Sequence, residues 1–349
     1  MPRVQTPMPT AAILPTHTPG LFNQAVLKTA RLLRSGGVAA VPSETVYGLA
    51  ANAFSPVAIR GIYRAKGRPS SNPLIVHVAT AAMARTCAAE WPELAEVLAR
   101  HFWPGPLTLV VPKSSKIPDI VSAGGPTVGL RWPSHPFFQS LIRECDFPLA
   151  APSANPSDHL SPTTAEHVMA SLGQRIPLIV DAGACAVGIE STVVDVTGQR
   201  PRILRPGIIS ADQIAQAAGM DADVALPAPE GPLRSPGQLS RHYSPKARLA
   251  VWSWGSDAEL LDRVTRESMP SERLFVLTHS RVPRDPIPAQ VSFMPDDPEA
   301  FARAFYGYLH ECDDRGAALV VVEELPAGSA WDGVRDRLLR ASAPAARAV

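Results

Sequence analysis

Two basic side chains stand two positions apart in a loop that prolines stiffen. Lys66 and Arg68 lie in the segment Lys66-Gly-Arg68-Pro-Ser-Ser-Asn72-Pro. A lysine point charge and an arginine fork, held beside the amide of Asn72, suit a polyphosphate ligand. The alternative is a loop whose charges are merely solvated, and the residues alone favour neither. His77 follows in an apolar run, where a histidine is more often a hydrogen-bonded core residue than a ligand-binding one.

A second group of polar side chains follows the first predicted strand. The segment Pro42-Ser-Glu-Thr-Val-Tyr-Gly-Leu49 carries two hydroxyl groups, a carboxylate and a phenol. We expect it at a strand-to-helix junction, where exposed donors can meet a ligand. The alternative, which the spacing favours, is a turn in which Ser43 or Thr45 caps a helix.

Further hydroxyl groups and arginines follow later predicted strands. Arg131 ends the apolar run Thr127-Val-Gly-Leu-Arg131, and a buried arginine requires either a ligand carboxylate or an internal acid. The other clusters are Ala151-Pro-Ser153-Ala-Asn155 with Ser161 after it, Gly188-Ile-Glu-Ser191-Thr192, and Arg202-Ile-Leu-Arg205. Each alone is a polar turn. Together they occupy strand ends, where open α/β sheets bind ligands.

The elements that must position these residues are short strands alternating with helices. Thr18-Pro19 predicts a capped helix start, and apolar residues recur at helical spacing as far as Leu33 before Gly36-Gly37. The expected strands are 38–41, 74–78, 107–111, 127–132, 178–180, 192–196 and 202–204. Ser210 caps a last helix that ends near Gly219.

The chain length of 349 residues and a change in composition predict two domains. Residues 1–18 are expected to be a flexible tail, 19–220 the first domain, and 221–246 a proline-rich linker. In residues 247–345, strands at 249–252, 274–277 and 319–323 alternate with helices near 256–267, 298–314 and 331–341. This alternation predicts a small three-layer α/β domain with a parallel sheet.

Composition and missing motifs exclude several classes of protein. The net charge is +1, with 33 basic and 32 acidic residues, which argues against binding nucleic acid by charge alone. Four scattered cysteines form no zinc motif and no disulfide framework, so a reducing cytoplasm is expected. No apolar run is long enough for a membrane span. Neither a P-loop nor a G-x-G-x-x-G fingerprint occurs.

Seven motifs in one order carry a specific resemblance. They are PSETVYGL, KGRPSSNPL with its following histidine, FWPGPLTLV, PSAN, SPTTA, ESTVVD and LRPG. This order resembles the YrdC/TsaC family of threonylcarbamoyl-AMP synthases. The linker motif Ser235-Pro-Gly…His242-Tyr243-Ser-Pro245 and the second domain resemble the long, two-domain form. Ser43 stands where threonine is commoner, and residues 207–209 lack an expected second glycine.

The resemblance implies a fold and a reaction. The expected fold is a twisted, mixed-sheet YrdC-like α/β domain with a concave cleft, followed by a small Rossmann-like domain. The expected reaction joins L-threonine, bicarbonate or CO2, and ATP into threonylcarbamoyl-AMP and releases pyrophosphate, which makes the chain a nucleotidyltransferase. Mg²⁺ is expected on the ATP, without dedicated protein ligands and with no other metal site. The product would pass to the tRNA threonylcarbamoyl transferase complex, without membrane attachment or stable nucleic-acid binding.

The resemblance also implies roles for individual residues. Lys66 and Arg68 are expected to be catalytic. The residues expected to hold threonine are Thr45, His77, Arg131, Ala151 and Ser191. Those expected to hold ATP are Arg68, Asn72, Thr127, Ser153, Ser161, Arg205 and Tyr243.

The proline-rich linker is expected to act as a lid, with Tyr243 folding over the nucleotide. The alternative is an inert, stiff spacer. Two rival functions remain at this stage: a double-stranded-RNA-binding or ribosome-maturation factor, and a carbamoyl transferase domain of the hydrogenase-maturation type. The near-zero net charge argues against the first rival. The second normally comes with acylphosphatase and zinc-finger modules, which this sequence lacks.

Overall fold

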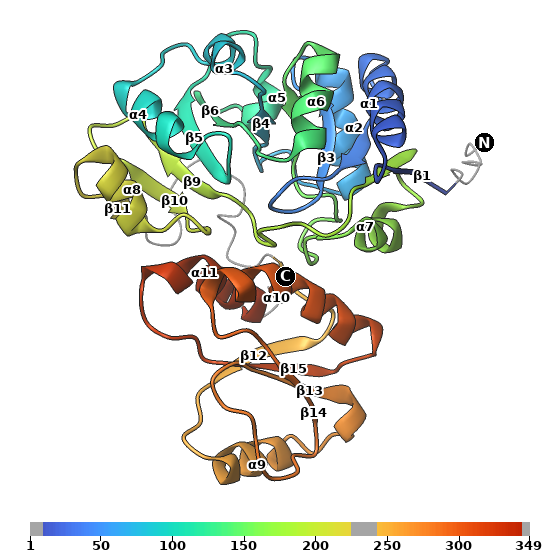
Figure 1. Cartoon of the computed structure of the whole chain (residues 1–349), viewed down its shortest axis with the longest axis vertical. Coiled ribbons are helices and arrows are strands. Elements are labelled where there is room, and N and C mark those ends of the chain that lie inside the picture. Colours follow the sequence, from blue (N-terminus) through green and yellow to red (C-terminus); the bar gives the residue numbers. More distant parts are fainter. Residues whose placement is uncertain (1–9, 225–242, 344–349) are drawn as a thin grey trace.

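Eleven strands share one mixed sheet in the order β1-β8-β2-β3-β7-β4-β6-β5-β9-β10-β11 (Figure 1). The computed structural model describes residues 10–224 and 243–343. Strands β4 and β6 are parallel, whereas β5 and β6 are antiparallel, so the predicted mixed sheet is confirmed. The strands are β1 (Ala12–Pro15), β2 (Ala39–Val41), β3 (Gly48–Asn52), β4 (Ile75–His77), β5 (Leu107–Pro112), β6 (Thr127–Arg131), β7 (Leu149–Ala150), β8 (Leu178–Asp181), β9 (Thr192–Asp195), β10 (Arg202–Arg205) and β11 (Asp223–Val224).

Helices cover both faces of this sheet. On one face, α1 and α6 pack against each other and bury residues such as Leu33 and Phe137. On the other face, α2, α4, α7 and α8 contribute to the largest apolar core, for example through Ile59 and Ile214. The helices are α1 (Pro19–Arg34), α2 (Pro56–Lys66), α3 (Ala81–Cys87), α4 (Glu93–Phe102), α5 (Asp119–Ser122), α6 (Pro136–Cys145), α7 (Ala165–Leu172) and α8 (Ala211–Ala218).

The predicted helix starts follow from capping side chains. Thr18 accepts a hydrogen bond from the backbone N–H of Leu21, and a proline occupies the first turn of α1. Ser210 and Gln213 form a reciprocal capping box at the start of α8, which ends at Gly219 in the left-handed conformation. Local sequence therefore fixed these boundaries.

The prediction of a flexible tail over residues 1–18 is wrong for part of that segment. Residues 12–15 form β1, which pairs in parallel with β8 at the edge of the sheet. Ala12 pairs with Leu178 and Leu14 with Val180. Residues 11–14 are apolar, but this run is too short to identify as a strand by itself. In the folded chain, the edge of β8 has unpaired backbone groups with which the segment can pair. Residues 1–9 lie outside the described part of the chain.

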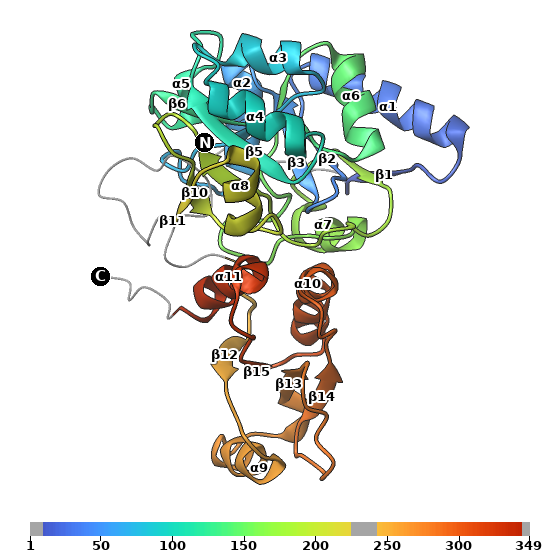
Figure 2. The ribbon, with the colours of Figure 1, turned by 60° about the vertical axis from the view of Figure 1, so that its left-hand side comes forward.

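The C-terminal domain has a four-stranded parallel sheet in the order β12-β15-β13-β14 (Figure 2). Helix α9 packs on one face, with Leu260 against Val276 and Val321. Helices α10 and α11 pack on the other face, and the predicted three-layer arrangement is thereby confirmed. Strand β14 was not predicted. The elements are β12 (Arg248–Trp252), α9 (Asp257–Arg266), the 3₁₀ turn Ser271–Arg273, β13 (Leu274–Thr278), β14 (Gln290–Phe293), α10 (Pro298–Asp314), β15 (Leu319–Glu323), the 3₁₀ turn Ser329–Trp331 and α11 (Asp332–Ser342).

The predicted linker, residues 221–246, has ends that belong to the folded core. Residues 223–224 form β11, which pairs in parallel with β10. Tyr243 is 1% exposed, and Ser244 forms a β-bridge with His159 of the first domain. Residues 225–242, including most of the expected lid, lie outside the described part of the chain.

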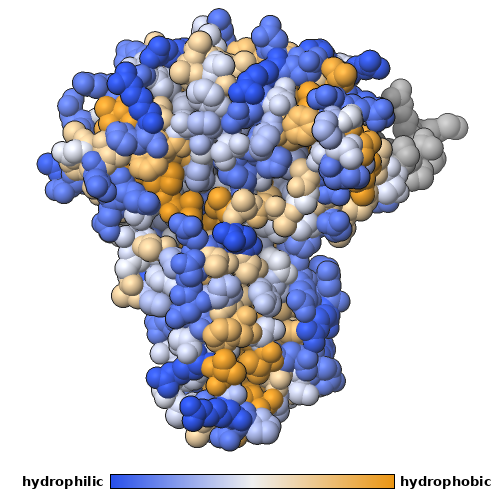
Figure 3. Space-filling view, viewed as in Figure 1, coloured by the Kyte–Doolittle hydropathy of each residue, from blue (hydrophilic) through white to orange (hydrophobic). Residues whose placement is uncertain are grey.

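The two domains share an apolar core. Val46, Leu160 and Ile189 of the first domain belong to the same buried cluster as Phe305 and Tyr306 of α10. Figures 1 and 2 show α10 and α11 lying between the C-terminal sheet and the first domain. The face in Figure 3 is mostly hydrophilic, with apolar patches on both domains. None of the described helices is long and apolar enough to cross a membrane.

Candidate active site

One pocket gathers most of the predicted site residues. It lies where the last residues of β4, β6 and β10 meet the β2–β3 loop and the segment before β9. The predicted residues that line it are Thr45, Arg68, His77, Arg131, Ala151, Ser153, Ser191, Arg205 and Tyr243. Of the predicted residues, Lys66, Asn72, Thr127 and Ser161 lie outside its lining.

Arg131 meets an internal acid at the end of β6. Its Nη2 lies 2.7 Å from Oε1 of Glu44, and its Nη1 donates to Oγ1 of Thr45 at 2.8 Å. Burial alone would raise the pKa of the Glu44 carboxyl, but the Arg131 guanidinium outweighs it and holds that pKa below its ordinary value. The sequence left two partners open for Arg131, a ligand carboxylate or an internal acid. The structure shows the internal acid, Glu44.

The segment that carries Glu44 and Thr45 is a bent connection between two strands, and the predicted strand-to-helix junction is wrong. Strands β2 and β3 pair antiparallel on either side of it. Ser43 Oγ donates to the carbonyl of Val46 at 2.5 Å and accepts from the N–H of Thr45 at 3.2 Å. Because Ser43 satisfies this turn, its hydroxyl has a structural use, and Thr45 and Glu44 are left to contact Arg131.

His77 is buried, as its sequence context favoured, but one of its ring nitrogens is left over. It is 4% exposed, and its Nδ1 has no hydrogen-bond partner within the described part of the chain. Its ring stacks on Phe138 of α6, with centroids 4.9 Å apart. Burial, reinforced by the Arg131 charge, lowers the pKa of His77 to about 3. The imidazole is therefore neutral near pH 7 and can donate or accept one hydrogen bond in the pocket.

The proline-stiffened loop is buried, so a solvated loop is excluded. Arg68 donates through Nε to the carbonyl of Asn72 at 3.1 Å, and through Nη2 to Asn72 Oδ1 and the carbonyl of Pro73. These acceptors are neutral, and Arg68 forms no ion pair within the described residues. Burial lowers the pKa of Arg68 to about 10, which still leaves it cationic near pH 7. Asn72 does not line the pocket itself; it orients the Arg68 side chain, which does.

Lys66 points away from the pocket lining. Its Nζ donates to the carbonyls of Ser153 and Asn155, each at 2.5 Å, and lies 3.2 Å from Asn155 Oδ1. Burial, and then the charge of Arg68, lower the pKa of Lys66 well below its ordinary value. In this arrangement Lys66 fixes the 153–155 loop, whose Ser153 lines the pocket. The geometry favours a positioning role over a direct phosphate contact.

Thr127 lies at the start of β6, four residues before Arg131. Strands β4 and β6 are parallel with His77 opposite Arg131 and Ile75 opposite Gly129. His77 and Arg131 therefore lie at the carboxyl ends of the two strands. Thr127 lies at the other end, where the Arg68 loop leads into β4. At about 3.3 Å per residue, the two ends are roughly 13 Å apart.

Ser191 and Arg205 form one wall of the pocket. Arg205 donates through Nε and Nη2 to the carbonyl of Ser191 at 3.1 and 2.9 Å, and Nη2 lies 3.2 Å from Ser191 Oγ. Thr108 Oγ1 shares a 2.8 Å hydrogen bond with Ser191 Oγ. Tyr243 completes this wall, with its hydroxyl 3.5 Å from Arg205 Nη1. Tyr243 was the linker residue with a predicted role in the site, and it lies at the pocket.

Ser161 is held by a buried acid that sequence reasoning missed. Its hydroxyl donates to Oε1 of Glu190, which also accepts from Tyr306 of the C-terminal domain. Burial opposes ionisation of Glu190, but the charges of Arg337 and Arg205 lower its pKa to about 2. Phe138 and Glu190 are among the pocket residues that were not predicted, Glu44 contacts Arg131, and Arg337 contacts Glu190. The two acids stand next to Thr45 and Ser191 in recognised motifs, which was the available signal; Arg337 stands in no motif.

The arrangement separates two kinds of subsite in one pocket. At one end, Arg131, Thr45 and neutral His77 offer donors to a small ligand with a carboxylate and a hydroxyl. Toward the Arg68 loop and Arg205, buried cations suit phosphate oxygens. Among the described residues, no cluster of three or more histidine, cysteine or acidic residues could hold a metal ion.

Comparisons with known proteins agree over both domains. The Sua5/YciO/YrdC family model, described as "Telomere recombination", matches residues 31–207, and the model "Threonylcarbamoyl-AMP synthase, C-terminal domain" matches residues 209–343. Threonylcarbamoyl-AMP synthases of Pyrococcus abyssi and Bacillus subtilis are 36% and 38% identical, over 90% and 91% of this chain and 92% of each relative. The crystal structure of P. abyssi Sua5 complexed with L-threonine is 33% identical, with a TM-score of 0.86, and the match covers 96% of this chain and 98% of that one.

Proposed function

The chain belongs to the Sua5/YciO/YrdC family, and on that premise we propose that it is a threonylcarbamoyl-AMP synthase. In this reaction L-threonine, bicarbonate or CO2, and ATP give threonylcarbamoyl-AMP and pyrophosphate, so the enzyme is a nucleotidyltransferase. The observation that carries the proposal is one pocket in which Arg131, Thr45 and His77 face Arg68 and Arg205. Such a pocket brings groups that suit an amino acid close to groups that suit a nucleotide's phosphates.

Threonine is assigned to the end of the pocket formed by β4 and β6. The Arg131 guanidinium is oriented by Glu44 and Thr45, and it suits the substrate carboxylate together with Ser191. The neutral imidazole of His77 can bond the threonine hydroxyl, since its Nδ1 is buried and has no partner among the described residues. The backbone at Ala151, whose N–H bonds the carbonyl of Ile75, closes this end. A site built to bond a hydroxyl rejects analogues that lack one.

ATP is assigned to the end formed by the proline-stiffened loop and β10. Arg68 and Arg205 are buried cations on the pocket lining, and they would neutralise phosphate oxygens. Asn72 contacts Arg68, Thr127 lies toward the Arg68 loop, and Ser153 and Tyr243 line the pocket. Ser161 would act through Glu190. We assign Arg68 to the catalytic step and Lys66 to holding the loop of Ser153.

The chemistry needs positioning and charge neutralisation more than a covalent nucleophile. The neutral amine of threonine attacks the carbon of CO2, which forms a carbamate and releases the amine proton. A carbamate oxygen then attacks the α-phosphorus of ATP, and the bond from that phosphorus to the bridging oxygen breaks. Pyrophosphate leaves with the bonding electrons. Arg68 and Arg205 would stabilise the charge that develops on the phosphates.

Further expectations concern the surroundings of the reaction. ATP would enter as its Mg²⁺ complex, because Mg²⁺ commonly binds substrate phosphates and retains several waters. The product would pass to the tRNA threonylcarbamoyl transferase complex without stable nucleic-acid binding by this chain. A cytoplasmic location is supported by the cysteines, since all four are buried free thiols.

Pyrophosphate release tests the proposed function. The purified chain should release pyrophosphate from ATP only when both threonine and bicarbonate are present, and mass spectrometry should detect the adenylate. Serine, which keeps the hydroxyl, and 2-aminobutyrate, which lacks it, serve as matched substrates. Tight RNA binding without threonine-dependent pyrophosphate release would refute the proposal and favour the RNA-binding rival.

A further inference from the structure

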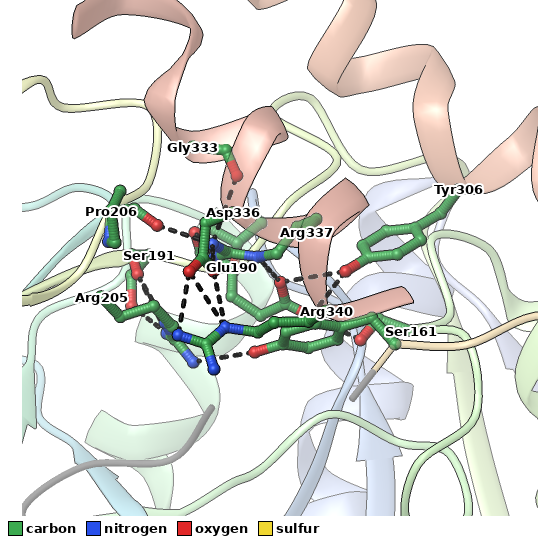
Figure 4. A network of polar contacts seen from close by, with 12 residues as sticks. Ser161, Glu190, Ser191, Arg205, Pro206, Tyr306, Gly333, Asp336, Arg337 and Arg340 are labelled. Atoms are coloured by element: carbon green, nitrogen blue, oxygen red, sulfur yellow. Dashed lines mark hydrogen bonds and ion pairs between the residues drawn. The ribbon is translucent and has the colours of Figure 1, made fainter. Parts of the chain in front are cut away.

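The C-terminal domain inserts one arginine into the wall of the pocket. Arg337 of α11 is 0% exposed. Its Nε lies 2.8 Å from Oε2 of Glu190, and its Nη2 donates to the Glu190 carbonyl at 3.1 Å. Its Nη1 donates to the carbonyl of Pro206 at 2.6 Å. Figure 4 shows this side chain bridging the two first-domain segments.

These two segments carry pocket residues that neighbour the contacts of Arg337. Glu190 precedes Ser191, and Pro206 follows Arg205. Ser191 and Arg205 are themselves joined by hydrogen bonds. A single guanidinium from the second domain therefore fixes the spacing of the two chain segments that form this wall.

Close backbone contacts hold the second domain in register on both sides of Arg337. A Cβ atom at Gly188 would lie 2.4 Å from Cα of Arg303 in α10. A Cβ atom at Gly333 in α11 would lie 2.6 Å from the carbonyl oxygen of Gly207. Only glycine permits these approaches. The two domains are therefore not loosely tethered. They pack closely enough to fix the position of the Arg337 side chain.

The charges around Glu190 give Arg337 a second effect. Glu190 is buried near both Arg337 and Arg205, and both charges favour its ionised form. While Arg337 contacts the carboxylate, Arg205 keeps its hydrogen bonds to Ser191. Without Arg337, the buried carboxylate would attract Arg205 away from them, because a buried charge requires a partner. The guanidinium of Arg337 also lies 5.2 Å from the ring centroid of Tyr243.

We propose that Arg337 is a positioning residue for the synthase reaction, through which the C-terminal domain holds Ser191 and Arg205 in their working arrangement. This inference rests on the proposed function of the pocket. It gives the second domain a defined part in the reaction: it completes the pocket wall from outside, although the residues assigned to threonine and to the ATP phosphates lie in the first domain.

The test compares Arg337→Met with the double variant Glu190→Gln/Arg337→Met in the pyrophosphate-release assay. In Arg337→Met, we expect kcat/KM to fall about a hundredfold, as for a misplaced binding group. The double variant should recover at least about tenfold, because the neutral amide at position 190 no longer draws Arg205 away from Ser191.

Arg335→Met is the matched control, since Arg335 lies in the same helix and pairs with Asp332 within its own domain. It should retain wild-type kcat/KM. Arg337→Lys keeps the charge beside Glu190 but not the bridge to Pro206, so it should lose activity without any gain from Glu190→Gln, and it serves if Arg337→Met does not fold. A double variant no more active than Arg337→Met would overturn the proposal. Absence of threonine-dependent pyrophosphate release by the wild-type chain would instead overturn the proposed function.

Discussion

Removing Arg131 should destabilise the protein through the carboxylate that it leaves behind. Arg131 and Glu44 are 4% and 6% exposed and lie 2.7 Å apart. Removing one partner of a buried ion pair costs about 3–5 kcal/mol. For a domain of this size, about 2–4 °C in Tm accompanies each kcal/mol, so Arg131→Met should lower Tm by about 6–20 °C. Urea unfolding and thermal melting measure both quantities.

The pH dependence of this loss has a definite sign. In the wild type, Arg131 lowers the pKa of Glu44, so the pair contributes stability above the ordinary pKa of a glutamate, and this contribution is lost as the pH falls through the folded value. In Arg131→Met that lowering is absent, and burial raises the pKa. The variant should therefore be most destabilised near neutral pH, and the deficit should shrink toward about pH 5.

A double variant separates the structural role of Arg131 from its proposed role in binding threonine. Glu44→Gln/Arg131→Met leaves no unpaired buried charge at the site of this ion pair, so it should regain most of the lost stability. It should still bind threonine weakly in calorimetric titrations, because the ligand carboxylate has lost its cation. A loss below about 1 kcal/mol in Arg131→Met, or a double variant no more stable than the single one, would refute the ion-pair reasoning.

Three further predictions follow from the same structure. Burial lowers the pKa of His77 to about 3 from 6.5, so between these pH values the unfolded chain binds one more proton, and the free energy of unfolding decreases as the pH is lowered. In urea unfolding, His77→Asn should reduce this slope by about 1.4 kcal/mol per pH unit, whereas His101→Asn at an exposed site should not. Gly188→Ala, at φ +86° and against the backbone of α10, should lower Tm, whereas Gly307→Ala, with open space in the same helix, should leave Tm unchanged or raise it. Arg68→Ala should slow pyrophosphate release about a hundredfold at saturating ATP, and a near-normal rate would remove its loop from the site.

The expectation for Lys66 shows where residue type and spacing stop being informative. A lysine and an arginine two positions apart indicate a phosphate site equally well whichever way each side chain points. The structure turns Lys66 toward the carbonyls of Ser153 and Asn155 and leaves Arg68 on the pocket lining. The difference arises because Lys66 is the last residue of α2 whereas Arg68 follows the left-handed Gly67.

Local sequence by itself determined the features that depend on near neighbours. The cap at Thr18, the capping box at Ser210 and the helix end at Gly219 follow from hydrogen bonds and backbone conformations within a few residues. The alternation of strands and helices after residue 247 likewise predicted the second domain. The order of the seven motifs indicated the family, because each motif keeps its residue types whatever the surroundings.

Only the tertiary structure decided which distant groups meet. It paired Arg131 with Glu44 across 87 positions of sequence and Arg337 with Glu190 across 147, and it gave residues 12–15 a strand partner at β8. The two ion pairs depend on burial, because a charge removed from water needs a partner. The pairing of residues 12–15 depends on the unpaired backbone groups at the edge of β8. Sequence patterns report which residues need such partners, but the packing of the two domains chooses the partners themselves.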